Sequence, residues 1–432
     1  MYTRTRLSAM MFLQFFVWGA WYVSMTGFIT QAGMSGLTGA AYVVGPLAAI
    51  IAPFFLGMVA DRFFSTERVL SFLHLLGGAF LIAAPFVARP FELPPMPENS
   101  SLFYQAILHD LPAYKEPFTL MLFAHMLCYM PTLGLTTSLA FSHLENQERD
   151  FPLVRVLGTI GWIVGNLAIG QLQGGDKSPA QFYLAGGAGI LLGLYSLTLP
   201  HTPPPSKGKP TSFGQILGTD SFRLFKNPSY TVFIICSFLI CIPLAGYYQQ
   251  ARNFVESTGL LFQDSATTTM SFGQMSEIVF MLLMPFFFAR LGVKWMLLVG
   301  MGAWVARYGL FAAAAEDHIH WMVLIGVLLH GICYDFFFVT GMIYVDKKST
   351  QNIRSQAQGF LVLVTQGLGL GIGSKLFFAW VTKNTGPAPE KVLDWYSIWL
   401  YPALFAAAVM AIFFLFFWDK GEAPDDEASG MT

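Results

Sequence analysis

The chain is built from long apolar segments, each about as long as a helix that crosses a bilayer. Such a helix needs roughly 20 apolar residues. Counting along the 432 residues gives twelve segments, at 7–29, 40–59, 69–88, 118–141, 155–173, 180–199, 229–250, 268–289, 294–314, 321–344, 356–382 and 395–418. Because a backbone in lipid has to satisfy its own hydrogen bonds, we expect transmembrane helices and an all-α membrane protein.

The composition agrees with a membrane protein. Hydrophobic residues make up 55% of the chain and charged residues 11%, whereas soluble proteins carry about 25% charged residues. A net charge of -1 argues against a nucleic-acid partner, which would require a basic surface. All cysteines lie in apolar segments and offer neither a disulfide framework nor a zinc site, so we expect no metal and no cofactor. They are Cys128, Cys236, Cys241 and Cys333.

A polar linker divides the apolar segments into two sets of six. Residues 200–228 contain three consecutive prolines and several basic residues, a composition typical of a connection. We therefore expect an N-terminal half at 1–199, a cytoplasmic linker at 200–228, a C-terminal half at 229–418 and a tail at 419–432. Most Lys and Arg residues between the segments fall on the side of the N-terminus, which predicts that both termini are cytoplasmic.

Asp335 lies in the middle of an apolar segment that runs from Met322 to Tyr344. A charge at the centre of a membrane helix costs roughly 2.5–3.5 kcal/mol on insertion scales, so such a residue normally faces a protein interior or a wet cavity. Asp335 is therefore a candidate functional residue. The alternative is a structural ion pair that holds two helices together.

The fifth segment carries Arg155, Thr159 and Trp162 at positions i, i+4 and i+7. This spacing places a cation, a hydroxyl and an aromatic ring on one stripe of a helix. The stripe favours a binding cavity. Alternatively, Arg155 extends from the helix end to the membrane interface.

Further polar residues lie in the seventh to ninth segments. Gln274 and Glu277 stand at i and i+3, on one helical face. Tyr248 belongs to a polar cluster that either binds a hydroxylated solute or meets water. Arg307 is a natural partner for a carboxylate, either Asp335 or Glu277.

Residues 57–62 read G-M-V-A-D-R and follow the second segment. They resemble the signature loop of the major facilitator superfamily, G-x-L-A-D-R, with Val59 in place of leucine. In that superfamily the aspartate meets the end of a neighbouring helix and helps to hold one access state. The resemblance implies a gating loop that contains Gly57, Asp61 and Arg62.

Several other stretches resemble the nucleoside:proton symporters of the same superfamily, and the similarity runs almost end to end. They are Phe12–Phe15 with Trp18–Trp21, Tyr129–Leu135, Arg155–Gly161, Gln274–Glu277 and Tyr334–Phe337. The resemblance implies the major facilitator fold, with twelve helices in two halves and a substrate site between them.

The resemblance also implies roles for individual residues. Ribose and base would be contacted by the residues that match the family's site, with Trp162 as an aromatic neighbour; these are Arg155, Thr159, Gln274 and Glu277. Tyr334 and Asp335 match an aromatic–acid pair whose acid takes part in coupling. This chain departs from bacterial nucleoside permeases at Ala245 and Tyr248, where those have Gln and Asn, and at His330, where they have Tyr. We include Tyr248 and His330 among the expected substrate contacts.

The leading hypothesis is a secondary active transporter that imports nucleosides by proton symport through Asp335 and Glu277. We expect it in the plasma membrane, specifically the bacterial inner membrane. An alternative is proton symport of another hydroxylated solute, such as a sugar or a cell-wall fragment. The sequence contains no Ser-His-Asp arrangement, H-E-x-x-H or phosphate-binding glycine loop, which argues against an enzyme and an ATP-driven pump. A channel would not need a titratable acid in mid-membrane.

Overall fold

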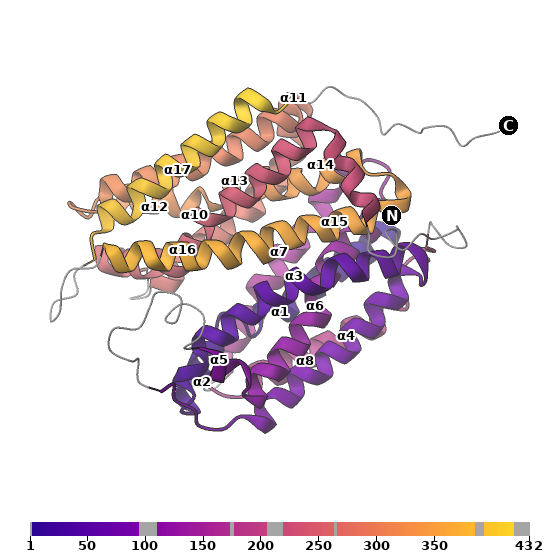
Figure 1. The fold of residues 1–432 in the computed structure, drawn as a ribbon, viewed down its shortest axis with the longest axis horizontal. Coiled ribbons are helices and arrows are strands. Elements are labelled where there is room, and N and C mark those ends of the chain that lie inside the picture. The colour runs from indigo at the N-terminus through magenta and orange to yellow at the C-terminus, as the bar shows by residue number, and fades with distance from the viewer. Residues whose placement is uncertain are drawn as a thin grey trace. The chain divides into compact units, whose positions relative to one another are not determined.

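The computed structural model describes residues 2–94, 110–172, 177–204, 219–262, 266–384 and 393–418, and nearly all of them are helical (Figure 1). The longer helices are α1 (Tyr2–Gly19), α3 (Thr38–Arg62), α4 (Thr66–Ala83), α6 (Pro117–His143), α7 (Gln147–Gln171), α8 (Ala180–Ser196), α10 (Pro228–Thr258), α11 (Ala266–Ala314), α12 (His320–Leu328), α14 (Thr340–Lys348), α15 (Arg354–Val362), α16 (Leu370–Lys383) and α17 (Trp395–Phe416). Residues 205–218 of the expected linker and the whole expected tail, 419–432, lie outside the described residues.

Shorter elements join or interrupt these helices. The short α-helices are α2 (Met25–Gln31), α5 (Leu111–Tyr114) and α13 (His330–Tyr334). Two π-helical turns, η5 (Asp335–Val339) and η7 (Leu363–Gly369), lie inside what would otherwise be continuous helices. Turns of this kind are rare in proteins, and those that occur are often found at functional sites.

Within the described residues, nine helical segments are long and apolar enough to cross a membrane. One of them, Thr268–Ala314, is 47 residues long, which corresponds to about 70 Å of helix against a hydrocarbon core of about 30 Å. It is interrupted at Gly292, where φ is 65° and ψ is -179°. Glycine adopts such a φ without steric cost. The element labelled α11 therefore contains two helices that meet at Gly292, which matches the separate segments expected at 268–289 and 294–314.

The first apolar segment differs from the expectation of one helix over 7–29. Helix α1 ends at Gly19, and α2 begins only at Met25. The intervening backbone forms turns, in which the amide of Tyr22 donates to the carbonyl of Trp18 at 3.2 Å. Glycine is a poor helix former, and the break follows Gly19 directly.

The chain divides into two compact units. The first comprises Met1–Glu145, Leu157–Gly218 and Gln358–Gly367, and the second comprises Asn146–Val156, Thr219–Ala357 and Leu368–Thr432. In the first unit, α4 packs against α8 and α6, and α3 packs against α6. Its buried core contains a cluster of aromatic rings, in which Phe28 and Phe182 lie 5.1 Å apart and edge to face.

In the second unit, α10 lies beside α16 and α17, while α11 packs against α12, α13 and α17 (Figure 1). Tyr308 and Trp399 stack here with their ring centroids 5.7 Å apart. Phe254 and Phe311 both pack edge to face against the same tryptophan. These buried rings join α10, α11 and α17 into one core.

Helices α1 and α7 approach each other so closely that a side chain at Gly161 does not fit. A Cβ atom there would lie 2.1 Å from the carbonyl oxygen of Phe12. Small residues of this kind allow the backbones of membrane helices to touch. The close approach places the next residue, Trp162, beside α1.

We expect Gly161→Ala to destabilise the protein, because the backbone of α1 has to move to admit the methyl group. Overpacking of this kind costs about 1–3 kcal/mol. Gly170→Ala on the same helix is the matched control, since a Cβ at Gly170 meets nothing within 4 Å. Heating the detergent-solubilised protein and measuring the fraction that stays monodisperse compares the two variants. Equal midpoints for both would contradict the packing argument.

Candidate functional site

Three of the charged side chains that the second unit buries lie on α11 and at the start of η5. Glu277 and Arg307 lie on the two limbs of α11, and Asp335 begins the π-helical turn η5. Asp335 and Arg307 are both 0% exposed, and Glu277 is 8% exposed. Charges at this depth are costly and mark functional sites by default.

A close backbone contact brings α13 next to the first limb of α11. A Cβ atom at Gly331 would lie 2.6 Å from the backbone carbon of Ser276, so only glycine fits. The Ser276 hydroxyl accepts a hydrogen bond from the amide of Gly331 at 3.0 Å and donates to the carbonyl of Gly273 at 2.6 Å. These contacts set the residues next to them, His330 and Glu277, side by side.

His330 and Glu277 form a direct contact. Nε2 of His330 lies 2.9 Å from Oε1 of Glu277, and both side chains are buried. One face of the His330 imidazole stacks on the ring of Tyr247 in α10, with ring centroids 5.3 Å apart and an interplanar angle of 17°. Glu277 is thus held by a partner that is itself packed in place.

Asp335 is surrounded differently. Neither of its carboxylate oxygens has a hydrogen-bond partner among the residues described. The three phenylalanines that follow it, at 336–338, are buried with it, and its charged neighbours are Glu277 and Arg155. A carboxylate in such surroundings is costly while it is charged and is relieved by a proton. The surroundings of Asp335 are therefore compatible with a residue that binds and releases protons.

The remaining residues expected at the site lie on both units. In the second unit, Arg155 on α7 is buried, and Gln274 on α11 is half-buried one turn before Glu277. Tyr334 is half-buried, and its ring lies 6.0 Å from that of His330 at an angle of 39°. Tyr248, by contrast, is 55% exposed.

In the first unit, Thr159 of α7 is buried and Trp162 is half-buried. The Trp162 indole meets Trp18 edge to face, with ring centroids 5.4 Å apart. The structure thus describes an aromatic pair at this point, of which the sequence argument expected only Trp162 beside the substrate.

The residues of the expected gating loop lie in the last turns of α3 rather than in a loop. Helix α3 continues through Gly57 and Asp61 and ends at Arg62. The Arg62 side chain is 8% exposed, and the side chain of Asp61 lies outside the described part.

The expectation that Arg307 pairs with Asp335 or Glu277 is wrong. In the described part of the chain Arg307 forms an ion pair with neither carboxylate. Its Nε donates to the carbonyl of Gly326 at 3.1 Å, and its guanidinium lies over the ring of Tyr247, 4.1 Å from the centroid. The sequence argument also missed Tyr247, because nothing in the Tyr247–Tyr248 doublet tells which ring is buried.

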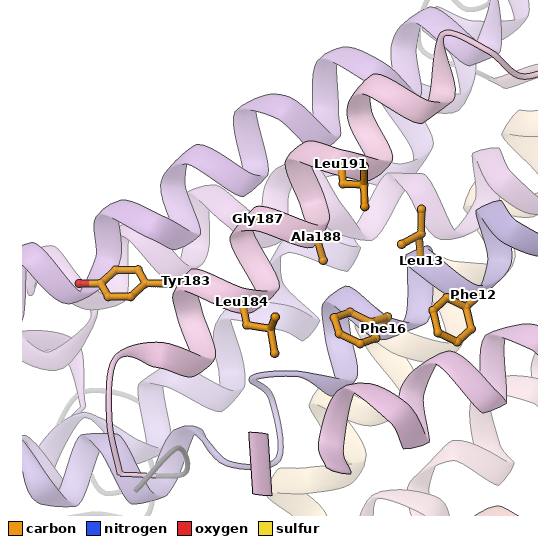
Figure 2. A pocket seen from close by; sticks show the side chains of 8 residues that line it. All are labelled: Phe12, Leu13, Phe16, Tyr183, Leu184, Gly187, Ala188 and Leu191. Carbon is orange, nitrogen blue, oxygen red and sulfur yellow. The ribbon is translucent and has the colours of Figure 1, made fainter. Parts of the chain in front are cut away.

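A separate pocket lies in the first unit, where Phe12, Leu13 and Phe16 of α1 face residues of α8 (Figure 2). Its other lining residues are Tyr183, Leu184, Gly187, Ala188 and Leu191. Only the Tyr183 hydroxyl brings a polar side-chain atom, and none of the expected site residues lines this pocket. Apart from that hydroxyl, the side chains of its lining offer no polar group to a substrate.

Comparison with known proteins identifies the family of this chain. A sequence model described as the nucleoside H+ symporter family matches residues 1–108 and 100–422. YegT of Escherichia coli strain K12, provisionally named a nucleoside transporter, is 38% identical over 96% of this chain and 94% of its own length. Nucleoside permease NupG of the same organism is 30% identical over 95% of this chain and 96% of its own.

Solved structures show the same fold. A crystal structure of NupG matches with a TM-score of 0.66 and 28% identity, over 97% of this chain and all of that one. The proton:xylose symporter XylE, of the major facilitator superfamily, matches with a TM-score of 0.67 at 10% identity, over 98% of both chains. At this identity the second match shows the fold alone. The chain is an integral membrane transporter with the major facilitator fold, not an enzyme, and it belongs to the nucleoside H+ symporter family.

Proposed function

We propose that this transporter imports nucleosides together with protons. The observation that carries the proposal is Asp335, a fully buried carboxylate with no hydrogen-bond partner among the described residues, close to Glu277 and Arg155. A proton from outside neutralises Asp335, and release to the inside restores its charge. When the proton and the substrate favour the same conformation, their fluxes are coupled.

The family and the names of the relatives support a nucleoside as the substrate. We propose that Glu277 and Arg155 bind the ribose and base together with the other polar and aromatic side chains. These are Thr159, Trp162, Gln274, His330, Tyr334 and Tyr248. Glu277 accepts hydrogen bonds from ribose hydroxyls, and Trp162 stacks on the base.

A second candidate substrate is another hydroxylated solute, such as a sugar or a cell-wall fragment. It is favoured by the departures at Ala245, Tyr248 and His330, which change the side chains where nucleoside permeases carry amides and a phenol. A free sugar has no base to stack on Trp162, so competition experiments separate the two candidates.

We also propose the finer architecture. Twelve membrane helices follow when α11 is read as two helices and when α1 and α8 are added to the nine apolar segments. They form two six-helix halves at 1–199 and 229–418, with the linker at 200–228 and the tail at 419–432 on the cytoplasmic side of a bacterial inner membrane. Gly57, Asp61 and Arg62 then take part in gating on that side.

We expect Asp335→Asn to abolish uphill nucleoside uptake, because the amide keeps the shape of the side chain but cannot titrate. Substrate exchange between the two sides of a proteoliposome needs no net proton movement and should persist in part. Nucleoside uptake is measured with and without an imposed proton gradient, and substrate exchange is measured in the same vesicles. A variant that still concentrates nucleoside would remove Asp335 from the coupling role.

We expect Trp162→Ala to weaken nucleoside binding tenfold or more, since base–aromatic stacking contributes about 1–3 kcal/mol per base and about 1.4 kcal/mol is tenfold. Trp162→Phe, which keeps an aromatic face, is the matched control and should retain most of the affinity. Competition of uridine, adenosine and ribose against labelled nucleoside gives the measurement. If ribose competes as well as uridine and is equally sensitive to Trp162→Ala, the substrate is not a nucleoside.

A further inference from the structure

Four buried side chains of the second unit contact one another in a row, with a cation at one end and a carboxylate at the other. The Arg307 guanidinium carbon lies 4.1 Å from the centroid of the Tyr247 ring. The Tyr247 ring is nearly parallel to the imidazole of His330, at 17° and 5.3 Å. Nε2 of His330 then lies 2.9 Å from Oε1 of Glu277. We call these four residues the Arg307 stack.

The stack joins elements that are far apart in the chain. Tyr247 comes from α10, Arg307 from the second limb of α11, His330 from α13, and Glu277 from the first limb of α11. The exposed fractions are 0% for Arg307, 4% for Tyr247, 7% for His330 and 8% for Glu277. Burial increases from the carboxylate to the cation, so Arg307 lies at the enclosed end.

The position of Arg307 is not explained by an ion pair. A buried guanidinium is costly unless its charge is compensated, and in the described residues the contacts of the cation include the carbonyl of Gly326, the face of Tyr247 and the side chain of Tyr308. Attraction between a cation and an aromatic face is strongest when both are desolvated, as they are here. This contact therefore fixes the Tyr247 ring.

A fixed Tyr247 ring in turn restricts His330. The imidazole is stacked on Tyr247 on one side, and Tyr334 lies against it at 6.0 Å and 39°. Rotation of the imidazole would separate it from Tyr247 and move Nε2 away from Oε1 of Glu277. The orientation of the Glu277 carboxylate thus depends on the other three residues of the stack.

We propose that Arg307 and Tyr247 are positioning residues: they hold His330, and through it they hold the Glu277 carboxylate in the orientation that binds the substrate. The inference rests on the proposed function, in which Glu277 accepts hydrogen bonds from ribose hydroxyls. Neither Arg307 nor Tyr247 itself contacts the nucleoside in this account. Loss of the stack raises the KM for nucleoside and leaves the maximal rate largely unchanged.

The test compares Tyr247→Leu, which removes the ring, with Tyr247→Phe, which keeps it. Uridine uptake into proteoliposomes under a fixed proton gradient gives KM and maximal rate for each variant and for the unaltered protein. Because a misoriented carboxylate loses hydrogen bonds to the ribose, we expect Tyr247→Leu to raise KM about fivefold or more and Tyr247→Phe to leave it within about twofold. A purely structural brace would lower the amount of active protein, and so the maximal rate, without changing KM.

A double-mutant cycle tests the route through Glu277. If Tyr247 acts through Glu277, Tyr247→Leu adds little to the KM of Glu277→Gln, whereas independent effects multiply. An unchanged KM for Tyr247→Leu, an equal rise for Tyr247→Phe, or multiplied effects in the cycle would each overturn the proposal.

Two further results keep the outcomes distinct. If Tyr247→Leu does not reach the membrane, Arg307→Lys decides, because it keeps the charge but loses the planar face over Tyr247. We then expect its KM to rise severalfold, and an unchanged KM overturns the proposal. If the unaltered protein transports no nucleoside, the proposed function fails, and this outcome is separate from a failure of the stack.

Discussion

The cost of placing charge inside apolar helices governs the second unit. Glu277, Arg307 and Asp335 are all enclosed by apolar segments, and each is accommodated in a different way. The Arg307 guanidinium lies over the ring of Tyr247 and donates to a backbone carbonyl, and Glu277 contacts the imidazole of His330. Asp335 has neither kind of partner among the described residues. Unpaired charge at this depth is unfavourable, and of the three only Asp335 lacks a described polar or aromatic partner.

Backbone geometry creates these arrangements. The close approach at Gly331 and the Ser276 hydroxyl bring α13 against α11, and this contact lets His330 reach Glu277. Directly after α13, the π-helical turn begins at Asp335. A π-helical turn inserts an extra residue into a helix and shifts the direction of the side chains that follow. The site therefore depends on irregular backbone as much as on the charged residues themselves.

Much of the fold was predictable because hydropathy and length are properties of single segments. The apolar runs and the separation of 268–289 from 294–314 needed no tertiary information. The partner of Arg307 did, since a stack on Tyr247 joins residues from α10 and α11, and no spacing rule relates them. The π-helical turn at Asp335 and the break after Gly19 also arise from tertiary contacts and local geometry, which periodicity does not record. For the same reason the buried member of the Tyr247–Tyr248 pair was not predictable.

The two carboxylates are not equivalent, and the difference follows from their neighbours. Glu277 is already engaged by His330, an imidazole held by two aromatic rings. Its orientation is therefore defined, as recognition of a substrate hydroxyl requires. Asp335 is followed by three buried phenylalanines, and its carboxylate has no hydrogen bond among the described residues. A group that gives up no hydrogen bond on protonation can take a proton at little structural cost. The two acidic residues thus differ in their surroundings, which is the basis for proposing substrate recognition for Glu277 and proton exchange for Asp335.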